Sequence, residues 1–521
     1  MPTSLRINEI VERIWRRDYT IWKPSPEEIS NRLGWLDVPV SMQDHVEDIA
    51  AFANEVRSEG YRHVVLLGMG GSSLGPEVLR QSFGRPRNGY PDLIVLDSVV
   101  PAAVIAVTDL IDPSRTLFVV SSKSGGTIEP NSLYRHFRAV VEKAVGMERA
   151  GRGFVAITDP GTPLERMAQE HGFRRAFVNP PDVGGRYSVL SYFGLVPAAL
   201  IGLDVNELLA RAVEMRARCE DGRDNPGAEF GQYMGENALA GRDKLTLITS
   251  PSVSSFGLWV EQLVAESTGK EGKGIVPVAG ESRLDAQEYG EGRCFVYVWV
   301  EGDANVETDK LASRLADAGK PLLRLDLKDA YDLGAEFYRW EFATATAGAM
   351  LGVNPFDQPD VQRAKEMASE MIAEFRKTGR LPEPEGAGSF ESLVRSAGAG
   401  DYFAVLAFMR ETPYVDTAFT SLRKALSAKL GVATTLGYGP RYLHSTGQLH
   451  KGGPAGGVFL LVTAEHPRDL PVPGEQFTFA TLADAQALGD YLTLREKGRR
   501  VARVHLTSNL QSAIARMTDT L

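Results

Sequence analysis

Cysteine is almost absent from this chain of 521 residues, which contains only Cys219 and Cys294. Two cysteines are too few for a disulfide framework or for a structural zinc site built from several thiolates. Long apolar runs are missing too, since no stretch approaches the ~18 consecutive apolar residues of a membrane span. The first 24 residues carry arginine, glutamate and aspartate among the apolar residues and lack a signal-peptide core. We therefore expect a cytoplasmic protein without a membrane partner.

Positively charged side chains are outnumbered by negatively charged ones. The chain has 57 lysines and arginines against 67 aspartates and glutamates, which gives a formal net charge of −10 and a pI near 5.5. This balance argues against a nucleic-acid-binding surface. It does not exclude an anionic small molecule, because a pocket sets its own local field. The length is sufficient for two to four domains.

Alternating strand and helix patterns indicate the fold class. After an N-terminal helical arm (residues 1–45), a first domain is expected over residues 46–212, with strands at 63–68, 93–97, 116–121, 153–157 and 175–178. This alternation predicts an α/β fold with a doubly wound, mainly parallel sheet. Within the arm, Ile7–Arg17 has helical spacing, and Ser25-Pro26-Glu27-Glu28 fits a capped helix start.

Two further α/β units are expected at residues 228–378 and 389–521, joined by a linker rich in glycine and proline at 379–388. In the second unit we expect strands at 243–249, 295–300 and 322–327, with helices at 253–267, 309–318 and 336–351. In the third we expect strands at 401–409, 457–462 and 501–505, with helices at 415–430 and 482–496. Both units also have a glycine-rich approach to their middle strand. We interpret the third unit as a degenerate, partial duplicate of the second.

Two hydroxyl-rich turns follow strand patterns of the first domain. Gly68–Pro76 contains Gly71 and Ser72, and Ser121–Thr127 contains further hydroxyls together with a lysine. Backbone N–H groups at a helix N-terminus favour a phosphate, and the carboxyl edge of a parallel sheet is where open α/β folds bind ligands. Taken singly, either turn is also typical of a tight strand-to-helix connection. Together they predict a phosphate site made by Ser72, Ser122, Lys123, Ser124 and Thr127.

Three more segments carry residues suited to catalysis. Val183–Ser191 places Arg186 after two glycines, where its planar fork suits an oxyanion, although a structural pair with a carboxylate is the alternative. Gln262 and Glu266 are four residues apart, so they share one face of a helix; most such glutamates are solvated. His444 and His450 lie in a glycine-rich loop without a third metal ligand nearby, which favours a proton-transfer role over a metal site.

Together these segments resemble the phosphoglucose isomerase (glucose-6-phosphate isomerase) family. The resemblance extends over about residues 60–455 and covers the two phosphate turns, the arginine segment and the glutamate segment. It also includes Asn354–Lys365, similar to the family's Gln…Lys segment, and Leu443–Gln448, similar to its histidine loop. It implies two sugar-isomerase (SIS) domains, no metal, no other cofactor, and reversible conversion of glucose 6-phosphate into fructose 6-phosphate in glycolysis and gluconeogenesis.

The resemblance also implies a role for each matching residue. Glu266 would carry the proton between C2 and C1 of the sugar, and Arg186 would stabilise the enediolate. His444 would open the sugar ring with help from Lys365, and Glu129 would orient His444. Gln262 and Gln358 would line the site beside the phosphate-binding residues.

One departure from the family order concerns the histidine loop. In the family this loop falls between the base and the lysine segment, but here Ser282–Gly292 has no histidine and His444 follows both. If the third unit kept the histidine loop while the second kept the glutamate, the third unit must bring His444 to the pocket. It would do so within one subunit or across the interface of a homodimer, since family members are dimers with shared sites.

Three alternatives stay open at this stage. A non-catalytic sugar-phosphate-binding regulator would keep the phosphate hydroxyls and could lose Glu266, Arg186 and His444, all of which are present. An isomerase of dual specificity would also accept mannose 6-phosphate, which differs from glucose 6-phosphate at one stereocentre. The layout further resembles the isomerase part of bacterial transaldolase–isomerase fusion proteins, so linkage to a transaldolase is a third expectation.

Overall fold

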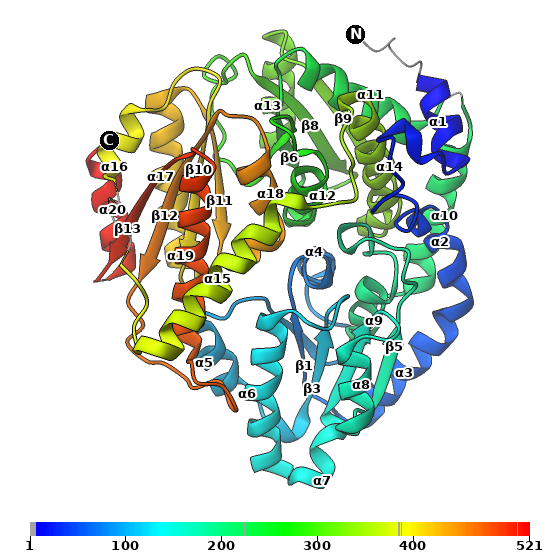
Figure 1. Cartoon of the computed structure of the whole chain (residues 1–521). Coiled ribbons are helices and arrows are strands. Elements are labelled where there is room, and N and C mark those ends of the chain that lie inside the picture. The colour runs from blue at the N-terminus through cyan, green and yellow to red at the C-terminus, as the bar shows by residue number, and fades with distance from the viewer. Residues whose placement is uncertain (1–6, 223, 384–385, 387, 508) are drawn as a thin grey trace.

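Three parallel β-sheets flanked by helices make up the computed structural model, which describes residues 7–222, 224–383, 386, 388–507 and 509–521. In Figure 1 the first sheet lies at the bottom, the second at the top and the third at the left, around the centre of the molecule. The expected α/β class with parallel sheets is therefore confirmed.

The first sheet has five strands in the order β2-β1-β3-β4-β5. Its central strands are runs of buried valine, leucine and phenylalanine, as expected where helices cover both faces of a sheet. The strands are β1 (His63–Gly68), β2 (Asp92–Leu96), β3 (Thr116–Ser121), β4 (Phe154–Thr158) and β5 (Arg175–Val178). The helices are α4 (Leu74–Phe83), α5 (Pro101–Leu110), α6 (Ile128–Val145), α7 (Met147–Ala150), α8 (Pro163–Glu170) and α9 (Tyr192–Leu200).

The second and third sheets have the same strand order, β7-β6-β8-β9 and β11-β10-β12-β13. The first four strands of the first sheet follow the same order, so the partial duplication stays an interpretation of the sequence. The second sheet comprises β6 (Lys244–Thr249), β7 (Val276–Val278), β8 (Arg293–Val300) and β9 (Leu322–Leu327). The third comprises β10 (Tyr402–Phe408), β11 (Ala433–Tyr438), β12 (Gly457–Ala464) and β13 (Arg500–Leu506).

Helices α10 to α14 pack on or near the second sheet: α10 (Val205–Glu220), α11 (Pro226–Leu239), α12 (Phe256–Thr268), α13 (Val306–Asp317) and α14 (Leu333–Leu351). The remaining helices lie in the last third of the chain: α15 (Pro359–Thr378), α16 (Phe390–Arg395), α17 (Pro413–Leu430), α18 (Gly447–Gly452), α19 (Phe479–Glu496) and α20 (Leu510–Asp519). The N-terminal helices are α1 (Ile7–Trp15), α2 (Val38–Ser41) and α3 (Val46–Ser58).

The units share their apolar cores. Helix α10 packs against α14, so the proposed boundary at residue 212 lies inside a helix that contacts the second unit. Helix α15 packs along α19 of the third unit. One core cluster joins Phe118 of the first sheet to Phe479 and Leu482 of α19. The third unit is therefore held against the first, and this contact positions the site described below.

The second and third sheets meet at their edge strands β7 and β11. Arg423 of α17 donates hydrogen bonds to the carbonyls of Ala279 and Gly280, which follow β7, and to the carbonyl of Thr434 in β11. The Glu281 carboxylate accepts from the Thr434 N–H at 2.9 Å. These bonds satisfy polar groups that two exposed sheet edges would leave unpaired.

The structure corrects two expectations about local structure. Strands β7 and β11 were not expected, and both are edge strands next to the first strand of their sheets. Residues 25–32 form turns instead of the expected capped helix, and Glu28 takes a left-handed φ of 50°, which a right-handed helix does not allow.

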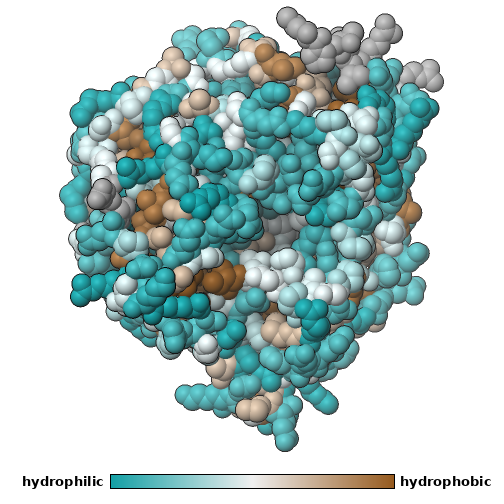
Figure 2. Space-filling view, in the orientation of Figure 1, coloured by the Kyte–Doolittle hydropathy of each residue, from teal (hydrophilic) through white to brown (hydrophobic). Residues whose placement is uncertain are grey.

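The two cysteines are free and buried. Among the described residues, every helix is too short or too polar to reach across a lipid bilayer. Figure 2 shows one face that is mostly hydrophilic, with hydrophobic atoms in small separate groups.

Candidate active site

The first glycine turn (Met69–Ser73) connects β1 to α4 and touches two other segments of the site. Gly70 has a φ of 56°, and a Cβ atom there would lie 2.6 Å from the His444 carbonyl oxygen. A Cβ atom on Gly71 would lie 1.9 Å from the Gly185 carbonyl oxygen. Both positions require glycine, because any side chain would force the turn away from its neighbours. This close packing places Ser72 at the carboxyl edge of the sheet.

The second turn (Ser121–Thr127) connects β3 to α6 and presents its hydroxyls beside the first. Ser122 Oγ lies 3.3 Å from Thr127 Oγ1 and accepts the Gly125 N–H at 3.2 Å. The Gly126 N–H donates to Ser124 Oγ at 3.3 Å. Thr127 immediately precedes α6, so these groups lie at a helix N-terminus, where partial positive charge favours an anion.

Lys123 of this turn is ion-paired with Asp159, which directly follows β4. Its Nζ also donates to the Pro181 carbonyl at 3.1 Å. Burial raises the pKa of Asp159, and the neighbouring Lys123 opposes that shift. The sequence analysis missed Asp159, although its place at the end of a strand on the ligand-binding edge was a usable signal.

Arg186 and Glu266 form a buried ion pair with an Nη1–Oε1 distance of 3.0 Å. Arg186 lies in the 3₁₀ turn before α9, and Glu266 lies in the last turn of α12. Arg186 also donates to the carbonyls of Pro355 and Asp357 and to Gln358 Oε1 at 3.2 Å. The arginine therefore joins the base candidate to the segment that carries Gln358.

Lys270 fixes this same segment from the other side. Its buried ammonium donates to the Asp357 side chain and to the carbonyls of Asn354 and Asp357. Burial is the main reason that the pKa of Lys270 falls to about 7, and the nearby Arg186 lowers it further. No role was expected for Lys270 from the sequence, where it only ends the segment that carries Glu266.

His444 comes from the third unit and reaches the first through Glu129. It ends a 3₁₀ turn, Arg441–His444, and its Nε2 lies 2.7 Å from Glu129 Oε1. Burial by itself would raise the pKa of Glu129, but the charge and hydrogen bond of His444 outweigh it, and the pKa lies below its usual value. Gln486 of α19 donates to the same oxygen at 2.6 Å.

Gln262 connects the base candidate to the histidine. Its Nε2 donates to Glu266 Oε2 at 3.1 Å and to the His444 carbonyl at 2.8 Å. A single amide group therefore bridges α12 of the second unit and the histidine loop of the third. The structure brings Glu266 and His444 into one site within one chain.

These residues surround a cavity of about 480 Å³ at the centre of the molecule. The predicted residues that line it are Gly71, Ser72, Ser122, Lys123, Ser124, Thr127, Gln262, Glu266, Gln358, Lys365 and His444. Lys365 lies on the exposed face of α15 and points along the same wall. Arg186 and Glu129 lie just behind the wall, in contact with Glu266 and His444.

His450, the second histidine of the loop, lies away from this cavity. It is a buried residue of α18, and burial lowers its pKa well below the ordinary value. A buried neutral imidazole packed against Tyr402 and Phe459 is a core residue, so His444 is the member of the pair that lies at the site.

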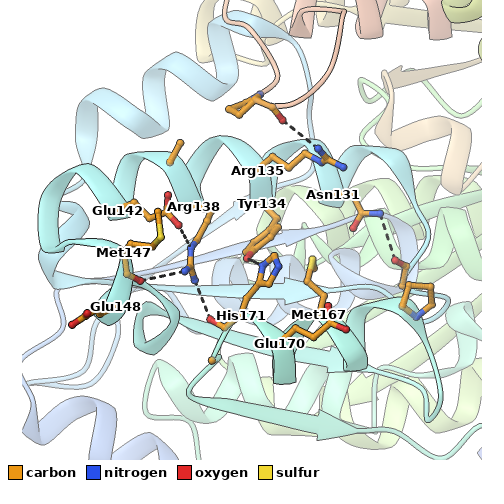
Figure 3. Close-up of a pocket in the computed structure, with 15 residues that line it drawn as sticks. Asn131, Tyr134, Arg135, Arg138, Glu142, Met147, Glu148, Met167, Glu170 and His171 are labelled. Atoms are coloured by element: carbon orange, nitrogen blue, oxygen red, sulfur yellow. Dashed lines mark hydrogen bonds and ion pairs between the residues drawn. The ribbon is translucent and has the colours of Figure 1, made fainter.

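A larger hollow of about 850 Å³ lies elsewhere, between α6 and α8 of the first unit (Figure 3). Two pairs of its polar side chains bond each other: Tyr134 Oη lies 2.6 Å from His171 Nδ1, and Arg138 Nε donates to Glu142 at 2.7 Å. Size alone therefore does not identify the site. The smaller cavity is the better candidate because hydroxyls, cations, carboxylates and an imidazole converge on it.

Within the part of the chain that the structure describes, no group of three or more histidine, cysteine, aspartate or glutamate side chains is placed to hold a metal ion. Metal independence stays a prediction. The donors around the cavity are hydroxyls, amides, an imidazole and cations, a set that suits a phosphate and sugar hydroxyls.

Comparison with known proteins points in the same direction. Residues 36–272 match the family model described as phosphoglucose isomerase. A glucose-6-phosphate isomerase of Rubrobacter xylanophilus is 32% identical over 403 residues, covering 66% of this chain and 92% of that protein. About a third of the chain is therefore not matched by this relative.

Two solved structures resemble the chain. Protein TT0462 of Thermus thermophilus, described as hypothetical, aligns with a TM-score of 0.62 and 25% identity over 70% of this chain and 94% of that one. A glucose-6-phosphate isomerase of Chlamydia trachomatis aligns with a TM-score of 0.56 and 22% identity over 71% of this chain and 78% of that one. At 22% identity, the likeness to the Chlamydia trachomatis structure concerns the fold alone.

Proposed function

The chain belongs to the phosphoglucose isomerase family, its reaction is the interconversion of glucose 6-phosphate and fructose 6-phosphate, and we propose that the central cavity performs it with Glu266 and His444 as the proton carriers. The observation that carries this assignment is the bridge made by Gln262, which bonds both residues. Reaction at C1 and C2 of a single sugar requires both groups to face that sugar.

In the proposed first step the sugar ring opens. The bond between C1 and the ring oxygen breaks, the ring oxygen gains a proton, and the C1 hydroxyl loses one to become an aldehyde. The carboxylate of Glu129 occupies Nε2 of His444, which leaves Nδ1 to exchange a proton with the sugar. A carboxylate that orients an imidazole in this way also stabilises its charged form. Lys365, on the same wall, would assist with its positive charge.

In the second step Glu266 moves a proton between carbons. Its carboxylate removes the proton from C2, the electrons form a C1–C2 double bond, and the C1 carbonyl becomes an oxyanion. A proton passes from the C2 hydroxyl to the C1 oxygen, the C2–oxygen bond becomes the carbonyl, and Glu266 returns its proton to C1 to give the ketose. The enediolate between these events carries negative charge on an oxygen. Arg186 lies 3.0 Å from Glu266, and its positive charge would stabilise this negative charge as it develops.

The phosphate would be held by the two turns at the start of α4 and α6. Ser72, Ser122, Ser124 and Thr127 donate hydrogen bonds, and Lys123 supplies charge. Because Lys123 is already paired with Asp159, the lysine is fixed in place before the substrate arrives. This preorganisation lowers the ordering cost of binding.

We expect Gly71→Ala to weaken sugar-phosphate binding. The new Cβ atom would overlap the Gly185 carbonyl oxygen, so the first turn must shift away from the Arg186 segment. A displacement near 1 Å at a positioned group costs roughly 10²-fold, and we expect the KM for glucose 6-phosphate to rise by about that factor. Gly222→Ala is the matched control, because a Cβ there meets open space. An unchanged KM for Gly71→Ala would contradict this account of the turn.

A coupled assay tests the activity itself. Glucose 6-phosphate converted to fructose 6-phosphate is the expected outcome, in chelator-treated buffer as well as in untreated buffer. The same assay with mannose 6-phosphate decides between single and dual specificity, which the donors around the cavity do not distinguish. Binding of both sugars without turnover would favour the regulator.

Further expectations about assembly and place in the cell remain proposals. Since one chain supplies both proton carriers, a homodimer is not needed to complete the site. A cytoplasmic location and linkage to a transaldolase follow from the sequence analysis and the resemblance stated there.

A further inference from the structure

An arginine three residues before His444 makes a two-point ion pair with the first unit. Arg441 Nε lies 2.7 Å from Asp97 Oδ2, and Arg441 Nη2 lies 2.9 Å from Asp97 Oδ1. Asp97 directly follows β2, and its side chain is only 3% exposed. The two residues are 344 positions apart in the chain, and neither belongs to the predicted site.

The same aspartate contacts the first glycine turn. Ser73 Oγ lies 3.4 Å from Asp97 Oδ2 and 3.2 Å from the Gly70 carbonyl oxygen. Gly70 in turn packs so closely on His444 that a Cβ atom would come within 2.6 Å of the His444 carbonyl. Asp97 therefore holds both the turn that precedes α4 and the loop that carries His444.

Two other side-chain contacts of this loop stay inside the third unit and do not fix the loop against the first unit. Tyr442 Oη donates to Asp490 Oδ2 at 2.7 Å, a bond that stays within the third unit. Arg441 Nη1 bonds Glu411 at 2.8 Å, which is again a contact inside the third unit. The Asp97–Arg441 pair is the charged contact that fixes the start of the turn against the first unit, while Glu129 fixes its end.

We propose that Asp97 and Arg441 are positioning residues that dock the histidine loop of the third unit onto the phosphate-binding turn of the first. The proposal rests on the function proposed above, because it assigns the pair a role in placing His444 for ring opening. Arginine is suited to this role, since its planar fork meets both carboxylate oxygens while lysine meets one. With the pair intact, the imidazole has one position relative to the bound phosphate.

Two substrates separate this role from a general loss of structure. Fructose 6-phosphate exists mainly as a ring and needs opening. Its 5-deoxy analogue has no hydroxyl at C5 and an esterified oxygen at C6, so it cannot close a ring and still offers C1 protons to Glu266. Deuterium incorporation at C1 of each compound in D2O, followed by NMR, reports ring opening plus proton transfer in the first case and proton transfer in the second.

The variants are Arg441→Lys and Asp97→Asn, tested separately in the full chain. Each keeps the approximate volume of its side chain and removes the charged two-point contact. The matched controls are Arg500→Lys and Asp401→Asn, because Arg500 and Asp401 form the same two-point pair at 2.7 and 2.8 Å. That pair lies at the amino ends of β13 and β10, away from the cavity.

We expect Arg441→Lys and Asp97→Asn to lower exchange from fructose 6-phosphate by roughly 10²-fold, while exchange from the 5-deoxy compound changes by less than about threefold. The controls should leave both rates near those of the wild-type chain. Equal losses with both compounds, no loss with either, or the same selective loss in the controls would each overturn the proposal. A wild-type chain that exchanges neither compound would instead overturn the proposed function.

Discussion

Glu266→Gln is expected to lower the turnover of glucose 6-phosphate by about 10⁴-fold, the upper range for removing a general base. The amide has nearly the same shape as the carboxylate and cannot take a proton from C2. The substitution also removes the negative charge that pairs with Arg186 at 3.0 Å, while Arg186 keeps its hydrogen bonds to the carbonyls of Pro355 and Asp357. Binding of the sugar phosphate should change little, because the phosphate-holding hydroxyls lie on other elements.

Glu261→Gln is the matched control for this variant. Glu261 precedes Gln262 on the same helix, α12, and does not line the cavity. Burial raises its pKa to about 8, against a smaller opposing effect of Arg423, so its side chain is largely neutral at pH 7 and the amide mimics that form. Turnover and calorimetric binding measured for both variants should separate them clearly. Wild-type turnover by Glu266→Gln would end the assignment of the base.

His444→Ala is expected to lower turnover of the cyclic sugars by about 10³-fold, within the usual range for a group that transfers protons. Exchange of the C1 protons of 5-deoxyfructose 6-phosphate should be largely retained, since an open chain needs no ring opening. The loss therefore lies in one step, and the Gln262–Glu266 contact that serves the other step persists without the imidazole.

The control for this variant is His466→Ala, which removes a partly buried histidine of the same unit that contacts Asp484. It should leave both substrates nearly unaffected. Normal ring opening in His444→Ala would show that another group carries the proton, and an equal loss with the open-chain analogue would show that the histidine serves Glu266 instead.

The fold could be predicted from the sequence wherever hydrophobic residues form a continuous run. Strands β1, β3, β5 and β9 coincide with their expected bounds. Strands β1 and β3 are continuous runs of buried valine, leucine and phenylalanine, whereas β9 alternates leucine with Arg324 and Asp326. Strand β7 has three residues with a proline in the middle, and β11 begins with alanine and two threonines. Their pairing comes from the neighbouring strand, a tertiary effect that local patterns do not contain.

The site was predictable where its residues sit in glycine-rich motifs. Arg186 and the two hydroxyl turns have such motifs, and all of them contact the central cavity or its lining residues. Glu266 lies on a helix and was identified by its spacing from Gln262 and by the family resemblance. Asp97 and Asp159 directly follow strands β2 and β4, so the sequence could have identified them as polar residues at the carboxyl edge of the first sheet. Gln486 and Arg441 had no local signal, because each acts through a partner more than 300 residues away.

The structure accounts for the position of His444, which follows the glutamate and lysine segments in this chain instead of lying between them. The second and third sheets share their strand order, yet the glutamate belongs to one and the histidine to the other. These two units contact each other through β7 and β11, and both also contact the first unit. The third unit thereby brings His444 to Glu129 and Gln262 within one chain.

Mixing two inactive variants tests this arrangement most directly. Glu266→Gln and His444→Ala chains are co-expressed with different tags, purified together, and assayed with glucose 6-phosphate. If each chain builds its own site, every site lacks one proton carrier, and the mixture should have only the summed residual activities of the two variants. Recovery of substantial turnover would mean that the glutamate of one chain works with the histidine of another, which contradicts a site completed within a single chain.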